Sequence, residues 1–270
     1  LDNGVLYVAR LNDDGTGEWL PLIYGEQGLT EEAGFSSQGD VLIKTRMAAD
    51  LLGATRMDRP EDIQQNPVNR KIYGAMTNNS RREEGDTDAA NPRPENRWGH
   101  VVEITEANDD AASTTFTWDL FLICGDPNDE STYFAGAPKD AVSPIACPDN
   151  VNFDGMGNLW ISTDGQPDAL ELADALHCVP TDGPQRGMVS QFLSVVAGSE
   201  CASFEFVDDT RNLVVSVQHP GEGTTLPAEV PADGSVPDGT MSAWPDGGLF
   251  YRPTVIQVWN ERGGKIGGDW

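Results

Sequence analysis

The stretch PEDI at residues 60–63 recurs twice in altered form, and this repeat decides the predicted fold. The second copy is PDNV at residues 148–151, and the third is SECA at residues 199–202. Each copy places an acid second, and each is followed by a short polar or glycine-containing gap and then an apolar stretch. The apolar stretches are KIYGAM, NLWIS and NLVVSV, which begin at residues 71, 158 and 212. Because such runs are typical of β-strands, the sequence predicts one structural unit repeated three times.

Each predicted strand ends in a side chain that can bind a metal ion, namely Asn78, Asp164 and His219, at 17, 15 and 19 residues from the acid. A repeated unit places equivalent side chains at equivalent points around an axis, so Glu61, Asp149 and Glu200 are expected to converge. Repulsion between close carboxylates costs on the order of 4 kcal/mol per pair at an intermediate dielectric. Either their pKa values rise or cations bind. Oxygen ligands with asparagine support fit calcium, and carboxylates with an imidazole also suit iron or manganese.

Each candidate also has a structural interpretation. Repeated β units often use an acid to bind turn amides, and Asp154 and Asp208 are expected to form turns. Arg59 lies two residues before Glu61, so it either clamps a tetrahedral anion such as phosphate or forms a salt bridge to Asp58 or Asp62. His219 is either a structural histidine or a metal or substrate ligand, whereas structural roles are expected for His100 and His177.

The composition excludes several partners. Acids number 44 against 17 Lys and Arg, which gives a net charge of −27. Such a surface repels nucleic acid and anionic membranes, and no apolar run is long enough for membrane insertion. The four cysteines form no C-x-x-C pair, which excludes a zinc ribbon or a redox motif. Two interpretations of the cysteines stay open: a disulfide between Cys147 and Cys201, or buried free thiols.

Units of about four strands with turns between them predict an all-β fold, a β-propeller. One inserted helix is expected over about 39–53, where apolar residues recur at helical spacing and Gly53 is placed to end it. His177 is expected to end a second, short helix. The chain starts on a strand without an initiator Met or a signal peptide. We therefore expect residues 1–270 to form a single partial propeller domain, the C-terminal part of a protein whose further blades and export signal lie upstream.

Familiar hydrolase motifs are absent from the sequence. It contains no G-x-S-x-G elbow, no Walker loop and no H-E-x-x-H pair. Nucleophilic serine chemistry is therefore unsupported, and metal-assisted hydrolysis is the natural reaction class.

Two neighbouring motifs carry a family resemblance. The segment KTRMAADLLGAT at residues 44–55, followed by MDRPED at residues 57–62, resembles the hallmark stretch of the PhoX-type alkaline phosphatases. Residues 71–79, 148–166, 197–202 and 215–221 fit the same pattern. Generic propellers share the GNLWI type of strand but not this helix joined to DRPE.

The resemblance implies a six-bladed propeller with an axial cluster of Fe3+ and Ca2+, which hydrolyses phosphate monoesters and some diesters. It also implies export in the folded state by the twin-arginine route, and hence a periplasmic or secreted protein. Arg59 would bind phosphate and Glu61 would bridge metals, with Asp149 and Glu200 as further ligands. The family's N-terminal half, with an iron-binding Cys and a Glu, has no counterpart here. This chain alone is therefore not expected to assemble the full cluster.

The expected function is that of an alkaline phosphatase that scavenges phosphate from small extracellular esters, as a monomer. Two alternatives stay open. The first is a calcium-dependent propeller lactonase, which would use one metal ion and would not need Arg59. The second is a non-catalytic propeller that binds a protein or carbohydrate through the loops at 78–96 and 220–248.

Overall fold

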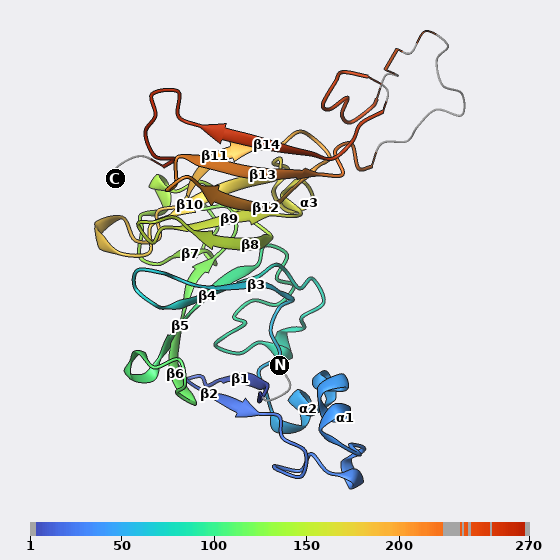
Figure 1. Cartoon of the computed structure of the whole chain (residues 1–270), viewed down its shortest axis with the longest axis vertical. Coiled ribbons are helices and arrows are strands. Elements are labelled where there is room, and N and C mark those ends of the chain that lie inside the picture. The colour runs from blue at the N-terminus through green and yellow to red at the C-terminus, as the bar shows by residue number, and fades with distance from the viewer. Residues whose placement is uncertain (1–3, 224–232, 234, 237–238, 249, 268–270) are drawn as a thin grey trace.

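The structure is a computed structural model that describes residues 4–223, 233, 235–236, 239–248 and 250–267. Three antiparallel sheets follow one another along the chain and stack along the long axis of the molecule (Figure 1). The predicted loop at 220–248 lies partly outside the described residues. Among the described residues, no helix has the length and apolar character that crossing a bilayer requires.

The first sheet contains the first repeat. Its strands are, in spatial order, β1 (Tyr7–Leu11), β2 (Thr16–Pro21), β6 (Thr115–Ile123), β5 (His100–Glu106), β4 (Ile72–Met76) and β3 (Pro60–Gln65). The short β7 (Tyr133–Phe134) also pairs with β6. The β1–β2 hairpin joins this sheet because Thr16 and Glu18 pair with β6. The N-terminal hairpin is thus an extension of the first sheet.

The second and third sheets contain the other repeats. The second has the order β11 (Ser190–Ser194), β10 (Ala175–Val179), β9 (Leu159–Thr163) and β8 (Pro148–Phe153). The third has the order β12 (Glu200–Val207), β13 (Asn212–Gln218) and β14 (Thr254–Trp259). The three predicted apolar strands are β4, β9 and β13, and the repeat phrases lie at the start of three further strands, β3, β8 and β12, which were not predicted from the sequence. His177 lies within β10, so the short helix expected to end there is wrong.

The middle sheet belongs to two apolar cores. Leu159 and Ile161 point from β9 into a core shared with the first sheet, which includes Tyr73 and Phe121. Trp160, between them in sequence, points the opposite way into a core shared with the third sheet. The alternation of a strand therefore lets β9 support both interfaces. Trp160 also donates from Nε1 to Asp154 Oδ2 at 3.0 Å, and Asp154 holds the preceding turn as expected.

The predicted single helix over 39–53 is two helices, α1 (Gln38–Ile43) and α2 (Thr45–Leu52). Lys44 leaves the helical region with φ −95° and ψ 36°, and the Thr45 hydroxyl donates to the Leu42 carbonyl that the break exposes. Gly53 ends α2 in the left-handed conformation, as predicted. One further helix, α3 (Gln166–Leu170), follows β9, and the short 3-10 turns are Glu31–Ala33, Glu84–Asp86, Ala107–Asp109, Lys139–Ala141 and Gly183–Gln185.

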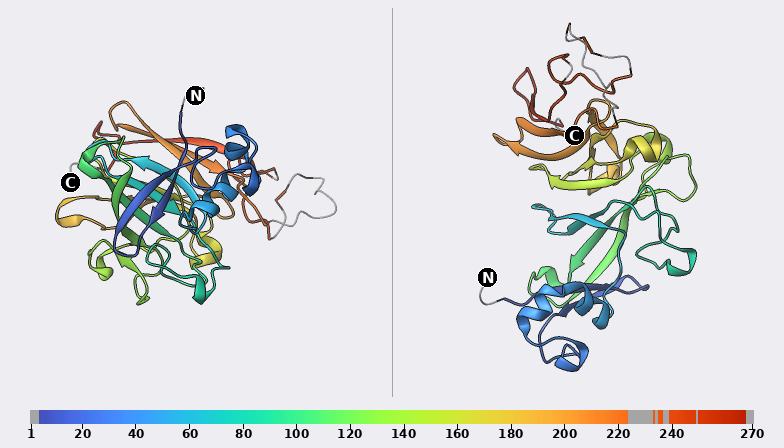
Figure 2. Two further views of the ribbon diagram at one scale, coloured as in Figure 1. Left: turned by 90° about the horizontal axis from the view of Figure 1, so that it is seen from below. Right: turned by 90° about the vertical axis from the view of Figure 1, so that its right-hand side faces the viewer.

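The inner strands of successive sheets lie side by side. Asp62 Oδ2 in β3 accepts the backbone N–H of Val151 in β8 at 3.0 Å. Asn152 in β8 donates from Nδ2 to Glu205 Oε2 in β12 at 3.3 Å. Consecutive antiparallel sheets joined at their edge strands β3, β8 and β12 are consistent with a partial propeller (Figure 2).

Candidate functional site

The repeat extends to an unusual backbone conformation. Arg59, Cys147 and Gly198 each lie two residues before a repeat acid and have φ of 52°, 51° and 68°. Only glycine adopts this left-handed region without steric cost. The pairing of β3 with β4 and of β8 with β9 is then interrupted by a bulge that includes the acid. A sharp bend and a bulge thus present Glu61 and Asp149 in the same way.

The far ends of the neighbouring strands are less regular than the sequence predicts. The carbonyl of Arg59 accepts the N–H of Thr77 at 3.1 Å, and the carbonyl of Cys147 accepts the N–H of Asp164 at 3.1 Å. The carbonyl of Gly198 accepts the N–H of Glu222 at 2.8 Å. These bonds place Thr77, Asp164 and Glu222 at equivalent positions of the three repeats. Asn78 and His219 lie at the same end of their sheets but at different points of the repeat.

Neighbouring repeat acids influence one another electrostatically: Glu61 acts on Asp149, and Asp149 acts on Glu200. Burial raises the pKa of Asp149 to about 6, and the charges of Glu61 and Asp164 add to this rise. Burial also raises the pKa of Glu200 to about 7, with further contributions from Asp164 and Asp149. Among the described residues, however, no group of three or more His, Cys, Asp or Glu side chains is arranged to hold a metal ion. The convergence of the three repeat acids on a metal ion therefore stays a prediction.

Arg59 contacts two of the predicted site residues. Its Nη1 donates to Asn78 Oδ1 at 2.9 Å, and its Nη2 lies 3.4 Å from Glu61 Oε1. The Arg59 side chain is 61% exposed, so its remaining N–H groups are accessible. The ion pairs with Asp58 or Asp62 that the structural interpretation predicted do not form, because both acids bind other groups.

His219 lies between two carboxylates. Its Nε2 is 3.1 Å from Glu200 Oε2, and its Nδ1 is 2.9 Å from Glu222 Oε2. The second contact has ion-pair distance but lacks hydrogen-bond alignment. Gln218 also donates to Glu200 Oε2 at 2.6 Å. Both imidazole nitrogens therefore face acids, and neither is directed at an open position.

A cavity of about 360 Å³ lies beside these groups, between the second and third sheets. Of the predicted site residues, Asp164 and Glu200 line it, together with Asp174, Ser199 and Glu222. Asp174 accepts hydrogen bonds from Thr163 Oγ1 and from the N–H groups of Gly165 and Gln166, so its role is to fix the turn after β9.

The family model for alkaline phosphatase PhoX matches residues 1–221. The chain belongs to the PhoX alkaline phosphatase family. Pseudomonas fluorescens PhoX, solved in complex with vanadate, a transition state analogue, is similar in structure, with 34% sequence identity and a TM-score of 0.82. The match covers 99% of this chain and 46% of that one, so the chain spans about half the length of this relative. Among curated proteins, no sequence gives a significant match.

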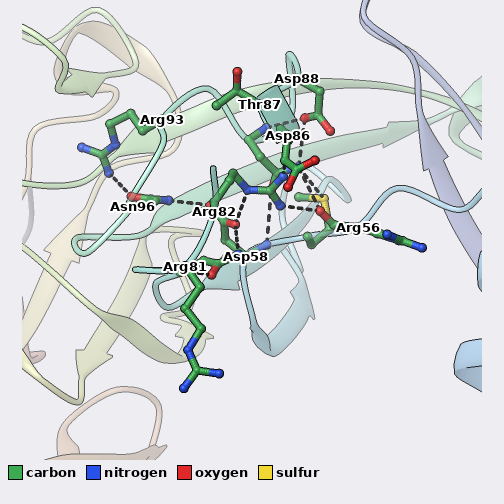
Figure 3. A network of polar contacts seen from close by, with 12 residues as sticks. Arg56, Asp58, Arg81, Arg82, Asp86, Thr87, Asp88, Arg93 and Asn96 are labelled. Atoms are coloured by element: carbon green, nitrogen blue, oxygen red, sulfur yellow. Dashed lines mark hydrogen bonds and ion pairs between the residues drawn. The ribbon is translucent and has the colours of Figure 1, made fainter. Parts of the chain in front are cut away.

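In this member of the PhoX family, a buried hydrogen-bond network is centred on Asp58, the residue that precedes Arg59. This network was not predicted from the sequence. Asp58 is fully buried, and its Oδ1 accepts from Arg82 Nε at 2.6 Å and from Asn79 Nδ2 at 2.9 Å. Its Oδ2 accepts from Asn96 Nδ2 at 2.9 Å. Figure 3 shows the Arg82 guanidinium enclosed between Asp58 and the Arg56 carbonyl. The network anchors the long loop after β4 to the residue that precedes Arg59.

The two remaining histidines are structural in this PhoX-family chain, as expected. His100 is buried in β5 and contacts Asn96 Nδ2 through Nδ1 at 3.1 Å. His177 is fully buried in β10. Burial lowers the pKa of each imidazole to about 4, so both are neutral at physiological pH. The four cysteines are buried free thiols, and no disulfide joins Cys147 to Cys201.

Proposed function

We propose that the protein is a metal-dependent phosphate monoester hydrolase, periplasmic or secreted, that releases phosphate from small organic esters. The observation that carries the proposal is an exposed Arg59 guanidinium 3.4 Å from Glu61, with Asp149 close enough for the charge of Glu61 to raise its pKa. A cation-binding acidic cluster next to an arginine is the arrangement that binds a tetrahedral dianion. Membership of the PhoX family, and the vanadate complex of a relative, support the same chemistry.

The donor set fits calcium. Calcium takes several carboxylate oxygens in a flexible geometry, and Glu61, Asp149, Asp164 and Glu200 offer such oxygens, whereas the Asn78 oxygen accepts from Arg59. The raised pKa values of Asp149 and Glu200 support this assignment, because carboxylates that repel one another gain most from a cation. His219 fits a metal ion less well, because its two nitrogens face Glu200 and Glu222. Fe3+ enters the proposal through the family resemblance and not through the residues of this chain.

The residues of the chain have distinct roles in this proposal. Glu61, Asp149, Asp164 and Glu200 would hold the metal ions, which would supply positive charge for the phosphate oxygens and the departing ester oxygen. Arg59 donates its free N–H groups to the phosphoryl oxygens, and its charge opposes the charge that develops there in the transition state. Asn78 and Glu61 hold the guanidinium in place, so little reorganisation is needed during the reaction.

The test uses the intact protein with a chromogenic phosphate ester, in calcium and after chelation. Arg59→Lys replaces the planar guanidinium by an ammonium group. It should lower kcat/KM about tenfold to a hundredfold, because that is the effect of losing a charge-assisted hydrogen bond. Replacing Glu61→Gln should abolish hydrolysis and its response to calcium. The control Glu130→Gln removes the same charge from an exposed loop and should have no effect.

Two results would contradict the proposal. One is full activity of the Glu61→Gln protein, and the other is hydrolysis by protein stripped of metal ions. A lactone assay on the same variants separates the lactonase alternative, in which Arg59→Lys leaves activity unchanged. Binding of a protein or carbohydrate that survives Glu61→Gln, without any hydrolysis by the wild type, would favour the binding module.

A further inference from the structure

Cys147 occupies the same point of the repeat as Arg59 but turns its side chain inward. Both residues have left-handed backbone conformations two residues before an acid, with φ of 51° and 52°. Cys147 is 2% exposed, and a Cβ on Gly165 would come within 3.1 Å of its sulfur. The absence of a side chain at Gly165 therefore leaves room for the thiol.

The thiol of Cys147 has two hydrogen-bond partners. It donates to the backbone carbonyl of Arg97 at 3.5 Å. Its sulfur accepts from Asn78 Nδ2 at 3.6 Å. Because a thiol has one proton and that proton is directed to Arg97, the sulfur is available to Asn78 only as an acceptor.

This arrangement fixes which way the Asn78 amide faces. An arginine can only donate hydrogen bonds, so the contact of 2.9 Å between Arg59 Nη1 and Asn78 requires the amide oxygen. The amide NH2 group must then face the other way, into the half-buried space where the Cys147 sulfur accepts it. Without an acceptor there, the amide would lose a partner on its inner side and the preference for this orientation.

We propose that Cys147 is a positioning residue, whose thiol orients the Asn78 amide so that Asn78 directs the Arg59 guanidinium toward the phosphoryl group of the substrate. The inference rests on the proposed function, because it assigns Arg59 to substrate. It adds a residue that touches neither substrate nor metal. The relay runs from the second sheet, where Cys147 precedes β8, to the first sheet, where Asn78 follows β4 and Arg59 precedes β3. The position of Arg59 therefore depends on contact between two sheets.

The test compares three variants of the intact protein. Cys147→Ala removes the hydrogen-bond donor and acceptor but keeps a Cβ in the same left-handed backbone conformation. It should raise KM for the ester and the inhibition constant of vanadate about threefold to tenfold. Cys147→Ser keeps a hydroxyl with one donor and lone pairs and should restore most of the loss. Asn78→Leu should have at least the effect of Cys147→Ala, because it removes the group that the thiol orients.

A double substitution separates positioning from packing. If Cys147 acts through Arg59, adding Cys147→Ala to Arg59→Ala should change KM by less than twofold. A full additional loss in the Arg59→Ala background would overturn the inference, as would an unchanged KM in the single Cys147→Ala protein. Thermal unfolding of each variant is measured alongside, since a packing role lowers Tm without this dependence on Arg59.

A crystal structure of the Cys147→Ala protein tests the relay independently of catalysis. Loss of the Arg59 Nη1–Asn78 Oδ1 contact, or rotation of the amide, is the expected result. An unchanged contact would overturn the inference. If the wild-type protein hydrolyses no phosphate ester, the proposed function fails, and the structural comparison still decides whether Cys147 orients Asn78.

Discussion

The carboxylate of Asp62 accepts the backbone N–H of Val151 at 3.0 Å and thereby joins β3 to β8. Asp62 directly follows Glu61, and Val151 lies two residues after Asp149. One side chain therefore sets the spacing between two of the acids that we assign to the metal site. Its second oxygen accepts the N–H of Ile63 at 2.8 Å, so the carboxylate is held from both sides.

Replacing Asp62→Ala should separate the two inner strands. A lost hydrogen bond that leaves a backbone N–H without a partner costs about 1–3 kcal/mol, so we expect the free energy of unfolding to fall by that amount. Calcium affinity, measured by titration calorimetry, should fall as well, although Asp62 is not a proposed ligand. Asp62→Asn retains an acceptor oxygen and should preserve most of the stability. Equal losses in the two variants would show that charge, and not the link to Val151, matters.

Asp58 should make a large contribution to stability. Its partner Arg82 has a side chain only 6% exposed, and Asp58 itself is fully buried. Replacing Asp58→Asn leaves an unpaired buried guanidinium, which costs about 3–5 kcal/mol. Urea unfolding measures this difference. The matched control is Asp109→Asn, which breaks an exposed pair with Arg70 and should cost about 0–1 kcal/mol. Similar losses in both variants would contradict the importance of burial.

Removing metal ions should make stability fall as pH rises. Because the folded-state pKa values of Asp149 and Glu200 are raised to about 6 and 7, the folded chain holds protons that the unfolded chain releases. Their stabilisation is present below about pH 4 and is lost as pH rises through the folded values. His100 and His177 act in the opposite direction, but only up to about pH 6.5.

The interval from pH 6.5 to pH 8 therefore isolates the carboxylates. In the presence of chelator, Tm should decrease as pH rises over this interval. Added calcium should remove the decrease, because its charge compensates the two carboxylates. The double substitution Asp149→Asn with Glu200→Gln should also give a flat profile. A decrease that persists in the double variant would mean that other groups cause it.

The four thiols should react slowly with a thiol reagent while the protein is folded. Burial raises the pKa of Cys147 to about 11 and those of Cys124 and Cys201 to about 12, and it also raises the pKa of Cys178. Since the thiolate is the reactive form, labelling at pH 8 should follow unfolding, with all four sites reacting together. Fast labelling of a single site in folded protein would show that one thiol is accessible.

The sequence predicted the repeat and the apolar strands that follow it, β4, β9 and β13, because apolar runs between turn residues carry a strong local signal. It did not predict the break at Lys44, since the apolar spacing over 39–53 is continuous and the break depends on bonds made by Lys44 and Thr45. His177 was assigned to a helix end because a short buried strand and a helix segment share the same apolar pattern.

Contacts in the candidate site could be predicted where both residues lie in one short motif. They could not be predicted where the partners are far apart in the sequence. Arg59 and Glu61 stand in one motif, and their contact follows from that spacing. The Asp58–Arg82 pair joins positions that are far apart in the sequence, and Arg82 lies in an irregular loop, so no sequence periodicity predicts the pair. The partners of His219 depend on the register of β12 against β13, which sequence spacing alone does not fix.

The opposite orientations of Trp160 and its neighbours Leu159 and Ile161 have a consequence for cooperativity. The second sheet shares one core with the first sheet and another with the third, whereas, among the described residues, the first and third sheets share no core with each other. Such a linear arrangement can fray from either end while its centre holds. Amide hydrogen exchange should therefore be slowest in β9 and faster toward β14 and the β1–β2 hairpin.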